Sequence, residues 1–68
     1  MAGQIYHMAE DYVTNNAASY DGQSEEQAAA RLAKGCRQHL FAEGWDTDDY
    51  GVDLEQLARE GLARHRST

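Results

Sequence analysis

The chain of 68 residues is short, acidic and rich in alanine. Its 12 acidic and 6 basic residues give a net charge of −6, which argues against a protein that binds nucleic-acid phosphates through Lys and Arg. This length fits one domain, and Cys36 is the only cysteine, so no disulfide can form within the chain. The sequence lacks a membrane-length apolar run and a signal-peptide pattern, and we therefore expect a cytoplasmic protein.

Apolar side chains recur at three- and four-residue steps through residues 4–20, and this spacing predicts a first helix. The stripe consists of Ile5, Met8, Ala9, Tyr12, Val13 and Tyr20. Because Asn15 and Asn16 are poor helix formers, a break after Val13 is the alternative. Asp21 and Gly22 then predict a turn.

A second helix is predicted for residues 24–43, with Ser24 as N-cap and Gln27 completing a capping box. Its apolar stripe is predicted to consist of Ala29, Leu32, Ala33, Cys36 and Leu40. A glycine inside a helix lowers its stability, so Gly35 suggests either a closely packed neighbouring helix or a tolerated surface position. Phe41 lies off the stripe, where it either covers another helix or meets another chain.

The end of this second helix is marked by Gly44, at the position after the C-cap. In a Schellman motif of this register, Trp45 contacts Leu40, so we expect Trp45 to cover the core. A third helix is predicted for residues 54–65, capped by Asp53. Val52 and Leu57 fit the two positions of a hydrophobic staple at its start. The predicted buried stripe of this helix is Leu54, Leu57, Ala58, Gly61 and Leu62.

These three segments predict an all-α fold, because alanine is abundant and proline is absent. Short connections favour antiparallel neighbours, so residues 1–68 are expected to form a single small antiparallel three-helix bundle. An extra short helical turn between helices two and three, within residues 46–50, is compatible with the sequence.

Charges are segregated along the chain: residues 31–42 hold three bases and no acid, and residues 43–55 hold six acids and no base. In an up-down-up bundle, Arg64 and Arg66 return to the first connection and partly neutralise Asp21, Glu25 and Glu26. The second connection is expected to lack such a basic neighbour, which leaves a concentrated negative patch. The candidate partner-binding residues are Glu43, Trp45, Asp46, Asp48, Asp49, Tyr50, Asp53 and Glu55.

Two short motifs in this acidic stretch resemble known sites but lack a required residue. The spacing from Asp46 to Gly51 resembles the start of an EF-hand loop, yet Tyr50 and Leu57 replace two of its oxygen ligands. The turn that ends with Asp53 and Leu54 resembles the attachment turn of acyl carrier proteins. That family carries phosphopantetheine on a serine after the aspartate, and here Leu54 follows instead. We therefore expect neither cofactor nor metal.

Catalytic and DNA-binding interpretations have little support in the sequence. Cys36 and His39 are three residues apart on one helix, but zinc needs further ligands and a thiolate nucleophile needs further groups. We expect a buried Cys36, a partly exposed His39 and no enzymatic activity. A helix-turn-helix would direct Arg59, Arg64 and Arg66 at DNA, but the connection is acidic and too long for the usual tight turn.

The sequence thus favours a non-enzymatic protein-interaction module, which presents its acidic patch to a basic, nucleic-acid-binding site of a partner protein. In size, charge and helicity it resembles phage-encoded anti-CRISPR inhibitors that act as nucleic-acid mimics. Direct binding to nucleic acid or membrane is not expected. The alternative is a self-associating structural or regulatory module, a homodimer formed through Tyr6, Tyr12, Gly35 and Phe41.

Overall fold

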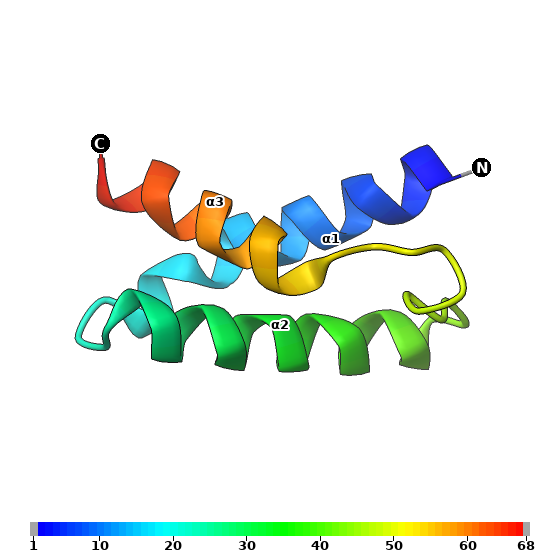
Figure 1. Ribbon diagram of the computed structural model, residues 1–68, viewed down its shortest axis with the longest axis horizontal. Helices are drawn as coiled ribbons and strands as arrows, with labels where there is room; N and C mark the ends of the chain where they lie inside the picture. The colour runs from blue at the N-terminus through cyan, green and yellow to red at the C-terminus, as the bar shows by residue number, and fades with distance from the viewer. Residues whose placement is uncertain (1, 68) are drawn as a thin grey trace.

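Three α-helices pack together in the computed structural model, which describes residues 2–67 (Figure 1). Helix α1 spans Ala2–Asn16 and is followed by a 3₁₀ helix, η1, at Ala17–Tyr20. Helices α2 and α3 span Glu25–Ala42 and Leu54–Arg66. No strand occurs within the described residues, and the predicted all-α bundle is confirmed. The ends of the predicted domain, Met1 and Thr68, lie outside the described residues.

The helices run up, down and up, with α1 and α3 packed along one side of α2 (Figure 1). The molecule is 32 Å long, and its two connections lie at opposite ends of α2. Five of the largest fully buried side chains form the centre of the core: Ile5, Val13, Leu32, Leu40 and Leu62. The predicted stripe of α3 is buried at every position. In α2 the stripe is rotated slightly, because Ala28 is buried whereas Ala33 is only partly so.

The first predicted helix is divided at Asn16. Its side-chain amide donates a hydrogen bond of 2.7 Å to the carbonyl of Tyr12, the group that the backbone N–H of Asn16 bonds in a regular helix. Such a local side-chain bond competes with the α-helical pattern, and Asn16 lies at φ −109° and ψ −4°. The chain then tightens into η1. The break therefore falls after Asn16 instead of after Val13.

Two glycines allow α1 to lie close to its neighbours. A Cβ atom on Gly35 of α2 would lie 2.5 Å from Oη of Tyr12, which confirms a close helix contact at this position. A Cβ on Gly61 of α3 would overlap Cγ1 of the buried Val13. Glycine thus sets how closely α1 approaches both other helices.

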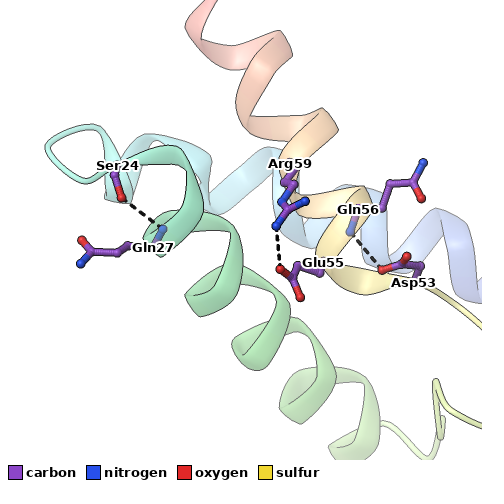
Figure 2. Close-up of polar contacts among 6 residues, drawn as sticks. All are labelled: Ser24, Gln27, Asp53, Glu55, Gln56 and Arg59. Atoms are coloured by element: carbon purple, nitrogen blue, oxygen red, sulfur yellow. Dashed lines mark hydrogen bonds and ion pairs between the residues drawn. The ribbon is translucent and has the colours of Figure 1, made fainter.

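The predicted N-caps of α2 and α3 are both present (Figure 2). Oγ of Ser24 accepts a hydrogen bond of 3.3 Å from the backbone N–H of Gln27, and Oδ1 of Asp53 accepts one of 3.1 Å from that of Gln56. Within the described residues neither glutamine side chain returns a bond to the cap residue. The capping box predicted at Ser24 is therefore only half formed, but each helix start is fixed.

Candidate interaction surface

The acidic segment, residues 43–55, leaves α2 through a tight stop at Gly44. The backbone N–H of Trp45 donates to the carbonyl of Leu40 at 2.9 Å, and that of Gly44 donates to Phe41 at 3.0 Å. These are the two bonds of a Schellman motif, and they require the left-handed conformation that Gly44 adopts at φ +93°. The predicted helix stop is confirmed. It fixes the direction in which the acidic segment starts.

Beyond Trp45 the acidic segment folds into successive turns at one end of the bundle (Figure 1). The backbone N–H of Asp49 donates to the carbonyl of Asp46 at 3.1 Å, and that of Gly51 donates to Asp48 at 3.2 Å. No helix forms within residues 46–50, so the suggested extra helical turn is replaced by these hydrogen-bonded turns. The acidic segment is therefore held by backbone hydrogen bonds at its start and in its middle, and by the Asp53 cap near its end.

The structure exposes all the acidic side chains that were predicted to bind a partner. These residues are Glu43, Asp46, Asp48, Asp49, Asp53 and Glu55. Two of them also stabilise the backbone, since Oδ1 of Asp46 accepts a 3.1 Å bond from the N–H of Asp48 and Asp53 caps α3. A cation of a partner would have to share these two carboxylates with the backbone N–H groups of Asp48 and Gln56.

Basic neighbours partly neutralise the acidic segment, contrary to the sequence-based expectation. Nη1 of Arg37 in α2 lies 3.1 Å from Oδ2 of Asp48, and Nη2 of Arg59 in α3 lies 2.9 Å from Oε1 of Glu55. Lys34 lines a surface hollow together with Arg37 and Glu55. The expected lack of basic neighbours was wrong because the segment folds back beside Lys34 and Arg37 of α2. Exposed pairs of this kind contribute about 0–1 kcal/mol each.

Glu43 and Asp49 are the two carboxylates of the segment whose side chains make no hydrogen bond or ion pair with other described residues. Glu43 is the C-cap residue of α2, and Asp49 lies in the middle of the turns. Their charges are fully available to a partner. These two residues are the strongest acidic candidates for contact with Lys or Arg.

Aromatic side chains accompany these charges. The rings of Trp45 and Tyr50 lie 5.6 Å apart between centroids and are tilted by 54°. Trp45 is half-buried against the core, as predicted, whereas 43% of Tyr50 is exposed. Phe41, in the last turn of α2, is 69% exposed and therefore does not cover a neighbouring helix. One end of the bundle thus combines free carboxylates with exposed aromatic rings.

Thr47 is a residue of this segment that sequence reasoning missed. Only 2% of it is exposed, although Asp46 and Asp48 on either side are both exposed. Its carbonyl accepts a 3.2 Å bond from the N–H of Val52, another buried residue of the segment. Together Thr47 and Val52 attach the acidic segment to the core. No spacing pattern marks Thr47 in the sequence, because the chain here follows no regular helix or strand.

The first connection receives the end of α3, as predicted, but through different contacts. Nε2 of His65 lies 2.9 Å from Oδ1 of Asp21, and Nη2 of Arg66 donates to the carbonyls of Tyr20 and Gln23 at 3.1 and 2.8 Å. The carboxylate contact is therefore made by His65, where Arg64 and Arg66 were expected. The acidic segment at the opposite end carries the larger group of carboxylates.

Cys36 and His39 lie in different environments, although they are only three residues apart on α2. Cys36 is fully buried, with Sγ 3.9 Å from the carbonyl oxygen of Ala9, and burial raises the pKa of its thiol to about 11. The thiol is therefore protonated at neutral pH. The exposed His39 lies against the ring of Tyr12, with centroids 5.2 Å apart. Within the described residues no three His, Cys, Asp or Glu side chains converge on a metal-sized site.

Comparison of the chain with protein-family models, curated proteins and solved structures found no match. None of the helices within the described residues is long and apolar enough to cross a membrane. Function is therefore inferred from the chemistry of the surface, and the acidic segment is its most distinctive part.

Proposed function

We propose that this protein is a non-enzymatic interaction module that presents its acidic segment to a basic site of a partner protein. The observation that carries the proposal is the exposure of every carboxylate in a segment fixed at both ends. A fixed set of charges attracts an oppositely charged surface and orients it during the encounter. Little conformational entropy is lost on binding when the surface is already ordered.

The basic site is proposed to be one that binds nucleic acid, so the protein acts as an inhibitor. Arg presents the same forked set of donors to a carboxylate and to a phosphate. Exposed carboxylates such as Glu43 and Asp49 can therefore occupy positions that phosphates take in the partner. This is the mode of action expected of a nucleic-acid mimic of the phage-encoded, anti-CRISPR type.

The carboxylates contribute unequally under this proposal. Glu43 and Asp49 engage the partner directly, because no described residue neutralises them. Asp48 and Glu55 engage it only when the partner's cation competes with Arg37 or Arg59. This ranking turns the broad acidic patch into a small set of residues for mutation.

Pull-down experiments with matched charge-reversal variants test the proposal. The double variant Glu43→Lys and Asp49→Lys changes the net charge as much as Glu10→Lys and Glu60→Lys, which are exposed on α1 and α3. We expect wild type and the α1/α3 variant to capture from the native host the same nucleic-acid-binding protein, identified by mass. The acidic-segment variant should lose it. Circular dichroism verifies that each variant stays helical.

Capture should also weaken as salt is raised, because ions screen exposed charges. If the acidic-segment variant retains the partner as well as wild type does, the proposed surface is wrong. If both charge-reversal variants lose it equally, net charge alone is responsible.

A homodimer is the second candidate, favoured by the exposed aromatic rings of Tyr6 and Phe41, which are 41% and 69% exposed. The other two residues predicted for that interface, Tyr12 and Gly35, already pack against each other within one chain. Sedimentation at several concentrations distinguishes the two functions. A tight dimer that survives charge reversal at Glu43 and Asp49 would favour self-association.

A further inference from the structure

Asp21 and Gly22 form the exposed turn between η1 and α2 (Figure 1). When glycine follows aspartate, its backbone nitrogen reaches the aspartate carboxyl group readily, because glycine has no Cβ to obstruct the approach. Every aspartate of the chain is exposed, but the other aspartates precede residues that carry a Cβ atom: Asp11, Asp46, Asp48, Asp49 and Asp53. The following residue therefore distinguishes Asp21, whereas its exposure does not.

The fold does not require a glycine at position 22. Gly44 has a positive φ, and Gly35 leaves room for the side chain of Tyr12. Gly22 has neither property, since its φ lies outside the left-handed region and a Cβ atom there would meet no heavy atom within 4 Å beyond its chain neighbours. Alanine can therefore replace Gly22 without disturbing the turn, which separates the chemistry of this glycine from its role in the fold.

Both groups that would react are accessible. The backbone N–H of Gly22 donates to no carbonyl among the described residues. The side chain of Asp21 is 60% exposed, and its Oδ1 lies 2.9 Å from Nε2 of His65. The free nitrogen and the carboxyl carbon belong to adjoining residues, so a succinimide ring can close once the backbone rotates.

The folded turn, however, holds a conformation that cannot close this ring. Asp21 has a helical ψ of −29°, whereas a succinimide places the next nitrogen level with Cβ, far from a helical ψ. The N–H of Gln23 donates to the carbonyl of Tyr20 at 3.0 Å, across the two reacting residues. The last turn of α3 adds the His65 contact and the bonds from Arg66 to the carbonyls of Tyr20 and Gln23. Reaction therefore needs a local opening whose free energy depends on these contacts.

We propose that Asp21 is a site of spontaneous isomerisation to isoaspartate, and that the last turn of α3 restrains the reaction. The nitrogen of Gly22 bonds to Cγ of Asp21 and loses its proton, the carboxyl group loses a hydroxyl, and one water is released. Water then adds to the other carbonyl of the ring and breaks its bond to the Gly22 nitrogen, which gives isoaspartate. Addition of water at Cγ restores aspartate instead.

The product changes the first connection. Its backbone passes through Cβ and Cγ of residue 21, which lengthens the connection by one carbon and displaces the carboxylate that faces His65. The acidic segment lies at the opposite end of the bundle (Figure 1). The inference is therefore independent of the proposed function, and either can fail without the other.

Prolonged incubation of the full chain at physiological temperature tests the inference. An endoproteinase that cleaves before aspartate does not cleave before isoaspartate, so isomerised chains yield one fragment of residues 11–45 in place of 11–20 and 21–45. An isoaspartyl methyltransferase counts the product independently. We expect wild type to accumulate isoaspartate at residue 21 above the level at its other aspartates. Gly22→Ala should reduce it to that level, with an unchanged circular dichroism spectrum.

His65→Ala tests the restraint by α3. The folded variant should isomerise roughly 2-fold to 10-fold faster than wild type, as expected when one hydrogen bond that opposes opening is lost. Arg64→Ala is the matched control, because within the described residues the Arg64 side chain makes no bond to the first connection. It should react at the wild-type rate. In urea, where the fold is lost, wild type and His65→Ala should react equally fast.

Wild type that forms no more isoaspartate at residue 21 than at its other aspartates would overturn the proposed site. Equal isomerisation in Gly22→Ala would overturn it as well, because the unobstructed glycine nitrogen would then not be needed. The restraint by α3 is rejected if folded His65→Ala reacts no faster than wild type, or if Arg64→Ala accelerates as much. A difference between wild type and His65→Ala that persists in urea also rejects it, because the imidazole would then act without the fold.

Discussion

Thr47 places a buried polar side chain in the middle of the acidic segment. It is the one polar residue that is buried within the described part of the chain, and its Oγ1 has no hydrogen-bond partner there. A buried hydroxyl without a partner lowers stability by about 1–3 kcal/mol. Its methyl group, in contrast, contributes apolar contact with the core. The side chain therefore has opposing effects on stability.

Thr47→Val separates these effects, because valine replaces the hydroxyl by a methyl group and keeps the branched shape. We expect the free energy of unfolding in urea to rise by about 1 kcal/mol, since the unpaired hydroxyl is removed. Thr47→Ser is the control, and it should lower stability because it keeps the hydroxyl and loses the methyl. A loss of stability in Thr47→Val would show that the hydroxyl stabilises the fold, and would contradict the cost assigned to an unpaired hydroxyl.

For single residues, the regular spacing of the helices made most of the buried positions predictable. Leu57 and Leu62 of α3 were identified because a helix brings residues of this spacing to one face. Thr47 and the Arg37–Asp48 pair were not, because they depend on the path of an irregular segment. The exposure of the carboxylates could be predicted from their charge, and the Glu55–Arg59 pair from its spacing of four residues in a helix. The pairing of Asp48 with Arg37 could not be predicted.

Among the elements, α3 depends on a residue that also belongs to the proposed interaction surface. Asp53 is exposed and carries a negative charge, yet its carboxylate also caps the first turn of α3. Substitution by alanine would therefore remove a charge and destabilise a helix together. A loss of binding in that variant would be ambiguous.

Asp53→Asn resolves the ambiguity, because asparagine is as good an N-cap as aspartate but carries no charge. We expect Asp53→Asn to unfold at nearly the wild-type urea concentration, and Asp53→Ala to lose about 1 kcal/mol of stability. Ser24→Ala, at the start of α2, provides a second cap for comparison and should lose a similar amount. Equal losses in Asp53→Asn and Asp53→Ala would show that charge, and not the cap, stabilises α3.

Element boundaries were predictable where a cap or a glycine defines them. Ser24, Gly44 and Asp53 each occur at a helix end that the structure confirms. The end of α1 was not located correctly, because Asn16 could either continue the helix or bond to the carbonyl of Tyr12. Packing of η1 against the other helices contributes to that choice, and such tertiary contacts are not visible in local sequence.

For the molecule as a whole, the distribution of charge is more balanced than the sequence suggests. Folding brings Arg37 and Lys34 of α2 to the hollow beside the acidic segment, and Arg59 of α3 to Glu55. The net charge of −6 is unchanged, but the local negative potential is lower than six adjacent acids would give. Arg37 therefore acts as an internal competitor for any basic partner.

Arg37→Gln should strengthen binding to a basic partner, because it frees the carboxylate of Asp48. An exposed ion pair is worth about 0.2–1 kcal/mol, so we expect the complex with a synthetic peptide that alternates Lys with Ser to be roughly 1.4-fold to 5-fold tighter. Arg31→Gln is the matched control, since Arg31 is an exposed base of α2 that makes the same change in net charge. Equal gains in the two variants would show that only overall charge matters. If Arg37→Gln alone gains affinity, and Asp48→Asn in the same chain cancels the gain, the ion pair itself limits how strongly the acidic segment attracts its partner.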